Sequence, residues 1–100
     1  MRRAAKIDDN QNEIVAAFRK RGFSVAITSS CHNGFPDLVV GKSGINYLVE
    51  VKDGTKPKSE QKLTQAQVKF SNNWMGQYAV VKSLEDVESL ITKHYRRMGC

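Results

Sequence analysis

Two carboxylates and a lysine, Asp37, Glu50 and Lys52, lie in the most apolar part of the sequence. Asp37 precedes the apolar run 38–40, whereas Glu50 and Lys52 interrupt a second apolar run that starts at Tyr47. Two acids can hold a hard divalent cation such as Mg²⁺, which prefers oxygen ligands and keeps several waters. A lysine beside them can stabilise charge on a phosphate or position a water for attack. These residue types predict phosphate chemistry, provided that the fold brings them together.

The elements around these residues indicate that they meet. A tight turn at 42–44 separates the runs 38–40 and 47–52, so the sequence predicts an antiparallel hairpin. In such a hairpin the start of the first strand lies beside the end of the second strand. Asp37 is therefore expected close to Glu50 and its neighbours.

The same residues also allow a simpler interpretation. Side chains alternate along a strand, so Leu48, Glu50 and Lys52 share one face. That face could simply contact water, as is common in antiparallel sheets. Asp37 after Pro36 could equally be an ordinary turn residue at the start of a strand.

Hydrophobic spacing, capping residues and glycines predict the remaining elements. Asp8 and Asp9 are expected to cap a first helix that Gly22 ends, and a polar segment at 53–62 is expected to be a mobile loop. The order αβββαβα predicts an α/β fold, a mixed central sheet of about four strands with helices on its faces. After the first helix we expect strands at 23–27, 38–40, 47–52 and 78–81, and helices at 64–74 and from Ser83 onward.

Length and charge limit the classes of function. A chain of 100 residues predicts a single domain over 1–100. Sixteen Lys and Arg against ten Asp and Glu give a net charge of +6, typical of a protein with a polyanionic partner such as nucleic acid. No apolar run approaches the roughly 20 residues of a membrane span, and the N-terminus lacks the apolar stretch of a secretory signal, so we expect an intracellular protein. Basic side chains gather at Lys56, Lys58 and Lys62, at Arg2, Arg3 and Lys6, and at Arg96 and Arg97.

The two cysteines, Cys31 and Cys100, indicate no disulfide framework. Cys31 and the adjacent His32 raise the question of zinc, with His94 and Cys100 as distant partners. Those spacings match no zinc module, so we expect a loop thiol and a free C-terminal thiol.

The site motif resembles that of a known nuclease superfamily. Pro-Asp at 36–37, followed after a hairpin by Glu-Val-Lys at 50–52, resembles the PD-(D/E)XK signature. Gln67 in Leu-Thr-Gln-Ala-Gln matches the glutamine of the extended motif, and Glu13 lies in the first helix, where many members carry an acid. Tyr-Ala-Val-Val-Lys-Ser at 78–83, before an acidic helix start, is similar to the VRR-NUC branch. The resemblance covers nearly the whole chain and implies a restriction-endonuclease-like core in a single VRR-NUC-like domain.

The resemblance implies a metal-dependent nuclease that hydrolyses phosphodiester bonds with Mg²⁺, with Mn²⁺ as a second usable metal and no small-molecule cofactor. Asp37 and Glu50 would bind the metal, the backbone carbonyl of Val51 would add a third oxygen, and Glu13 would complete the shell directly or through water. Lys52 would orient the nucleophilic water, and Gln67 would hold Lys52 or that water. Backbone phosphates of DNA would bind the basic loop at Lys56, Lys58 and Lys62.

The resemblance also implies a partner and a substrate. Small stand-alone members of phage type include Holliday junction resolvases, so the expected form is a homodimer that cuts branched DNA, and a phage or prophage origin fits. Other VRR-NUC members act on flaps and single strands, which stays an alternative. A non-catalytic nucleic-acid-binding domain with the same fold is a rival. An enzyme acting on another phosphorylated substrate is a second rival, although no G-x-x-x-x-G-K-[ST] loop is present.

Two residues of the helix expected at 64–74 keep two interpretations. Thr64-x-x-Gln67 has the form of a capping box, in which Gln67 bonds back to the helix start. Gln67 also shares a stripe with Phe70 and Trp74, which turns it toward the core and the site. Trp74 could supply a dimer contact or be buried within one subunit.

Overall fold

The computed structural model describes residues 7–99 of the chain. Its elements follow the expected order, with one short helix added in the segment that the sequence predicted to be a loop. Pro57, with φ −55°, precedes this extra turn, and Glu60 N donates to Pro57 O at 2.8 Å. The elements are α1 (Gln11–Lys20), β1 (Ser24–Ile27), β2 (Leu38–Lys42), β3 (Ile45–Val51), α2 (Lys58–Gln61), α3 (Gln65–Asn73), β4 (Tyr78–Val81) and α4 (Leu84–Arg97).

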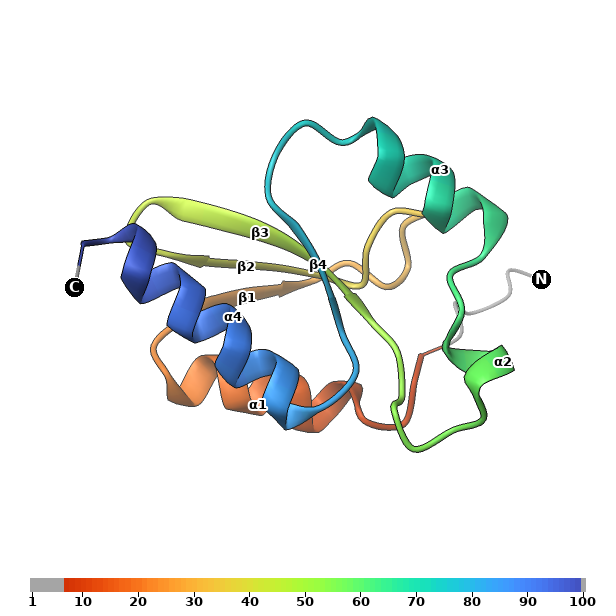
Figure 1. Ribbon diagram of the computed structural model, residues 1–100, viewed down its shortest axis with the longest axis horizontal. Helices are drawn as coiled ribbons and strands as arrows, with labels where there is room; N and C mark the ends of the chain where they lie inside the picture. Colours follow the sequence, from red (N-terminus) through yellow and green to blue (C-terminus); the bar gives the residue numbers. More distant parts are fainter. Residues whose placement is uncertain (1–6, 100) are drawn as a thin grey trace.

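The strands form one mixed sheet in the order β1-β2-β3-β4 (Figure 1). β1, β2 and β3 are antiparallel neighbours, whereas β4 runs parallel to β3. Ser43 and Gly44 have φ of 57° and 78°, the positive values that a two-residue hairpin turn requires. The resulting register pairs Leu38 with Val49, so Asp37 comes next to Glu50 at the end of the hairpin. The mixed α/β architecture predicted from the sequence is confirmed.

Helices α1 and α4 pack against the same face of the sheet (Figure 1). β3 presents Tyr47, Val49 and Val51 to this face, and all three are buried. Burial of such apolar side chains is the main favourable contribution to the stability of a domain of this size. The helices complete this core with Ile14, Val15 and Phe18 from α1 and Val87, Leu90 and Ile91 from α4.

The opposite face of β3 is covered as well, so the interpretation that it simply contacts water is wrong. Glu50 is 2% exposed and Lys52 is 8% exposed. α3 and the loop 28–36 lie on this side, joined by an edge-to-face contact of Phe35 with Phe70 at 5.3 Å between ring centroids. Gly34, with φ 76°, lies so close to α3 that a Cβ would come within 2.4 Å of the Ala66 carbonyl oxygen. The loop and α3 therefore form one layer over the acidic residues.

The start of α1 differs from the expectation. Asn10 is the N-cap residue, without a side-chain capping bond, and neither Asp8 nor Asp9 occupies that position. The Asn10 side chain instead donates to the carbonyls of Lys52 (3.1 Å) and Lys82 (3.2 Å). Because these carbonyls follow the ends of β3 and β4, Asn10 fastens the helix start to the sheet edge where the acids lie.

Three smaller expectations concern the rest of the chain. No helix within residues 7–99 is long and apolar enough to cross a membrane. Cys31 is an exposed free thiol, while His94 is buried with Nδ1 at 2.9 Å from Tyr47 Oη, so the two do not form a zinc pair. Arg2, Arg3, Lys6 and Cys100 lie outside the described residues.

Candidate active site

The two acids predicted to meet at the end of the hairpin do so. Asp37 Oδ2 accepts a hydrogen bond from Val51 N at 2.9 Å, which places this carboxylate beside the backbone that follows Glu50. A cavity of about 290 Å³ opens at this point. It is lined by Asp8, Asp37, Glu50, Lys52, Ser59, Glu60, Lys62, Thr64 and Gln67. The predicted acids and lysine therefore share one concave site.

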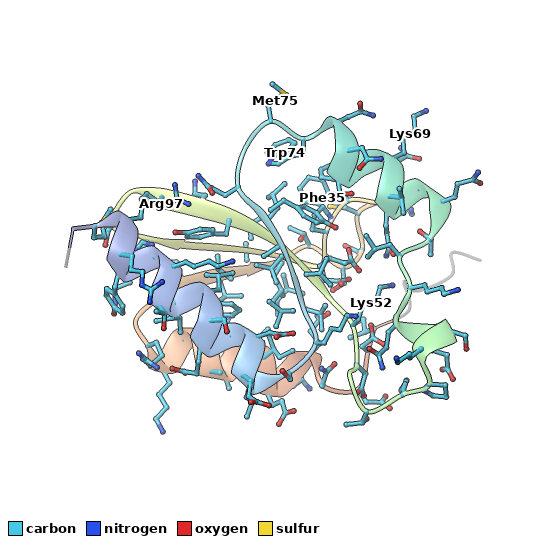
Figure 2. All side chains as sticks on the ribbon, in the orientation of Figure 1. Phe35, Lys52, Lys69, Trp74, Met75 and Arg97 are labelled. Carbon is cyan, nitrogen blue, oxygen red and sulfur yellow. The ribbon has the colours of Figure 1, made fainter. Side chains whose placement is uncertain are left out.

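Lys52 belongs to this cavity through its side chain and is fixed through its backbone. Its Nζ lies 4.0 Å from Glu50 Oε2. Its backbone N donates to Val81 O at 3.0 Å, and its carbonyl accepts from Asn10. Figure 2 shows Lys52 where the chain leaves β3 on the side of α2. The Lys52 ammonium therefore lies beside the buried Glu50 carboxyl, and the lysine side chain is itself mostly buried.

Gln67 fulfils both interpretations that the sequence left open. Its Oε1 accepts from Thr64 N at 2.8 Å and its backbone N donates to Thr64 Oγ1 at 3.2 Å, which is a complete capping box. Its Nε2 donates to Glu50 Oε2 at 3.0 Å. Gln67 thus contacts Glu50, whereas the resemblance implied a contact with Lys52 or with the nucleophilic water, and it links the start of α3 to the site.

The clustered carboxylates perturb one another in this buried space. Burial, followed by the adjacent Asp37 carboxyl, raises the pKa of Glu50 to about 9, while Lys52 lowers it only in part. Burial is also the largest cause that raises the pKa of Asp8. Glu50 Oε1 is buried and has no hydrogen-bond partner among residues 7–99. The neighbouring side chains therefore do not compensate an ionised Glu50, and they leave one of its oxygens without a partner.

This donor set fits a hard divalent cation. Within residues 7–99, no three His, Cys, Asp or Glu side chains are grouped closely enough to form a metal cluster by themselves. Mg²⁺ does not need such a cluster, because it is usually held by one or two carboxylates and retains several waters. Asp37 and Glu50 supply two carboxylates, and the orphaned Glu50 Oε1 is an oxygen that a cation would satisfy.

Glu13, predicted to complete the metal shell, is not brought to this cavity. α1 turns Ile14, Val15 and Phe18 into the core, which leaves Glu13 exposed on another side of the helix. It lines a separate cavity with Asp9 and Asp53, among others. The acid that reaches the site from the N-terminal segment is Asp8, which the sequence analysis had assigned to a helix cap.

The three lysines predicted to bind phosphates are divided by the structure. Lys62 lines the cavity and is exposed. Lys56 Nζ lies 3.6 Å from Asp9 Oδ2, and Lys58 is exposed at the start of α2. Lys62 is thus the one of the three that lines the cavity around Asp37 and Glu50.

Tyr78 is a neighbour of the site for which the sequence predicted a strand and a family-like segment but no place beside the acids. It pairs with Leu48 in the parallel β3–β4 ladder, so its side chain points to the same face as Leu48 and Glu50. Burial, then the charges of Glu50 and Asp37, raise the pKa of Tyr78 to about 12. Its hydroxyl is buried with no hydrogen-bond partner among the described residues. Only the parallel pairing with β3 reveals this proximity.

Comparison with known proteins gives one informative likeness. No protein-family model matches the sequence, and no curated protein matches it. A solved structure described as a VRR_NUC domain superposes with a TM-score of 0.66 at 27% sequence identity, over 82% of this chain and 89% of that chain. The fold, the hairpin acids and this likeness agree, and together they support the VRR-NUC family of nuclease domains for this chain.

Proposed function

We propose that this nuclease domain is a Mg²⁺-dependent DNA endonuclease whose site is the cavity around Asp37, Glu50 and Lys52. The observation that carries the proposal is the buried Glu50 beside Asp37 and Lys52, with a pKa raised to about 9 and an oxygen without a hydrogen-bond partner. Folded proteins rarely retain an uncompensated buried carboxyl group beside a second acid without a function for it.

The roles follow from the contacts. Asp37, Glu50 and the backbone carbonyl of Val51 would hold the metal, and Asp8 is placed to contribute through a water. Mg²⁺, when bound, lowers the pKa of a water and stabilises charge on phosphate oxygens. Lys52 orients the attacking water and offsets the charge that develops on the phosphate. Gln67 keeps the Glu50 carboxylate in one orientation.

We extend the proposal to branched DNA, such as four-way junctions, cut by a homodimer. The net charge of +6 supports a polyanionic substrate, and two equivalent sites related by a two-fold axis would match the paired arms of a junction. Lys62 at the edge of the cavity is the first candidate for a contact with a backbone phosphate. Flaps and single strands are the alternative substrates, and Mn²⁺ is the alternative metal.

The test is cleavage of labelled junction, flap, duplex and single-stranded DNAs of matched sequence, with Mg²⁺, Mn²⁺ or EDTA. We expect cutting with either metal, none in EDTA, and the highest rate on the junction. Asp37→Asn should remove the activity, and Glu13→Gln should retain it, because Glu13 lines a different cavity. Binding of all four DNAs without cutting under any metal would favour the non-catalytic rival, and light scattering decides between monomer and dimer.

A further inference from the structure

A second cavity, of about 470 Å³, lies beside α3 and differs in character from the acidic site. We call it the aromatic pocket. Its lining contains no carboxylate. Figure 2 shows Trp74 and Met75 just beyond α3, with Phe35 nearby on the loop and Lys69 on the helix. The lining residues are Asn33, Ala66, Lys69, Phe70, Asn73 and Trp74.

The aromatic rings are arranged as a flat platform. Phe70 and Trp74 are stacked, with ring centroids 5.5 Å apart and planes inclined by only 15°. Phe35 supports Phe70 edge-on at 5.3 Å. Trp74 nevertheless remains 43% exposed. The protein therefore covers one side of the stacked rings, and the other side is open to solvent. Such an open ring face offers stacking to another flat aromatic group.

The wall of the pocket is already in place. Asn33 lines it from the loop 28–36 with a left-handed backbone, φ 63°. Gly34 beside it lies against the Ala66 carbonyl so closely that no side chain would fit. This contact fixes the loop to α3, so a ligand would enter without first having to order the wall.

The polar groups at the rim suit a nucleotide. Lys69 is exposed and forms no ion pair with the described residues, so its ammonium is available to a phosphate. The amides of Asn33 and Asn73 carry both donors and acceptors, the groups that read base edges. Asn73 Nδ2 donates to Lys69 O at 3.0 Å, which holds this amide at the rim.

We propose that the aromatic pocket binds an unpaired nucleobase of the DNA strand, which stacks on Trp74 while Lys69 binds an adjoining phosphate. This inference rests on the proposed nuclease function and specifies its substrate: DNA in which a nucleotide near the bond to be cut is unpaired or can unpair, as at a branch point. α3 carries both Gln67, which contacts Glu50, and the residues that line the aromatic pocket. A strand with its phosphodiester at the acids therefore runs past the same helix. Base stacking on aromatic side chains tolerates any sequence because every base has a flat π face.

Trp74 is the only tryptophan of the chain, so its fluorescence reports on this pocket alone. In EDTA, where no cutting takes place, we would titrate the protein with a single-stranded oligothymidylate, with an abasic strand of the same length and with a blunt duplex. Stacking of a base should quench and shift the emission with the oligothymidylate, and the abasic strand, which has the phosphates without the bases, should leave the emission nearly unchanged. Equal quenching by the abasic strand, or none by the oligothymidylate, would overturn the inference.

Variants test the same contact through affinity. Trp74→Ala should weaken binding of a labelled oligothymidylate by about 5- to 150-fold, the range found when one base-stacking aromatic is removed. Trp74→Phe should retain most of the affinity, and Lys69→Ala should weaken binding with a shallower salt dependence. Met75→Ala is the matched control, because Met75 is adjacent and 97% exposed but does not line the pocket. Wild-type affinity in Trp74→Ala, with the fold intact by circular dichroism, would contradict the proposal.

The competing occupant is a second copy of the chain covering the same rings. In that case Trp74 emission would change with protein concentration in the absence of DNA, and Trp74→Ala would lower the molar mass measured by light scattering. That result would overturn the nucleobase site. Failure of the nuclease proposal would give a different result. The protein would then cut no DNA with any metal, but single strands would still quench the Trp74 emission. Asp37→Asn separates the two directly: it should lose cleavage and keep the quenching.

Discussion

Gln67 contacts Glu50 with one end of its side-chain amide and caps α3 with the other. Nε2 lies 3.0 Å from Glu50 Oε2, and Oε1 lies 2.8 Å from Thr64 N. The two bonds use different atoms of one amide, so the capping role and the site role do not compete. Gln67 therefore links the start of α3 to the buried Glu50 side chain. A substitution at the start of α3 should alter the position of Glu50, and a substitution of Glu50 should alter the start of α3.

We expect Gln67→Ala to lower both stability and activity. It removes the bond to Glu50 and half of the capping box, which together should cost about 1–2 kcal/mol of the free energy of unfolding. Urea unfolding and single-turnover cleavage measure the two effects. Gln65→Ala, an exposed change in the same turn, is the control and should be close to neutral.

Thr64→Ala separates the two roles of Gln67. It removes the Thr64 Oγ1 acceptor of the box while leaving the Gln67 amide free to contact Glu50. Stability should fall by about 1 kcal/mol while the rate of cutting stays near that of the wild type. If Thr64→Ala slows cutting as much as Gln67→Ala does, the bond to Glu50 is not what matters.

The hairpin and its acids were predictable because the signals are local. Ser43 and Gly44 fix a two-residue turn, the turn fixes the register, and the register puts Asp37 beside Glu50. The interior side of β3 follows from the same alternation of side chains. Nothing local indicated that the Glu50 side would also be covered, since that depends on α3 and the loop 28–36.

The positions of Asp8, Glu13 and Tyr78 were not predictable from local patterns. Asp8 reaches the site because Asn10 bonds to the carbonyls of Lys52 and Lys82, far away in the sequence. Glu13 is next to Ile14 in the sequence, yet the rotation of α1 leaves it exposed. Tyr78 lies near Glu50 only through the parallel pairing of β4 with β3. Each depends on packing between distant segments, which residue spacing does not encode.

Lys52→Ala should remove cutting without unfolding the protein. The lysine is 8% exposed beside a buried acid, so its loss takes away the positive charge expected to act on the phosphate. We expect single-turnover cleavage to fall by about 10²–10³-fold, as when a preorganised electrostatic contact is deleted. Lys20→Ala is the matched control, since Lys20 is exposed in the last turn of α1 and does not line the cavity. Cutting at the wild-type rate by Lys52→Ala would show that the chemistry lies elsewhere.

Asp37→Asn should weaken Mg²⁺ binding, measured by calorimetry with a cleavage-resistant DNA present and absent. An amide offers an oxygen without the charge that a hard cation prefers. Without metal and near pH 9, where Glu50 also ionises, the variant should be more heat-stable than the wild type, because one of two mutually repelling carboxylates is gone. Glu13→Gln should leave Mg²⁺ affinity unchanged, since Glu13 lines another cavity. Unchanged affinity in Asp37→Asn would exclude Asp37 as a ligand.

The metal-free protein should become less stable as the pH rises from about 5 to about 9. Burial and Asp37 raise the pKa of Glu50 from 4.5 to about 9 in the folded protein, so the folded state keeps a proton that the unfolded chain releases within this interval. Because the unfolded state then binds fewer protons, the free energy of unfolding falls with pH.

Glu50→Gln carries no titrating proton there, so its Tm in EDTA should change less across the interval and exceed that of the wild type at the alkaline end. A change of about 1 kcal/mol moves Tm by about 4–8 °C in a domain of this size, which thermal melts resolve. Addition of Mg²⁺ should reverse the loss in the wild type, since the cation replaces the proton, and should have little effect on Glu50→Gln. Parallel pH profiles for the two proteins in EDTA would contradict the assignment of the raised pKa to Glu50.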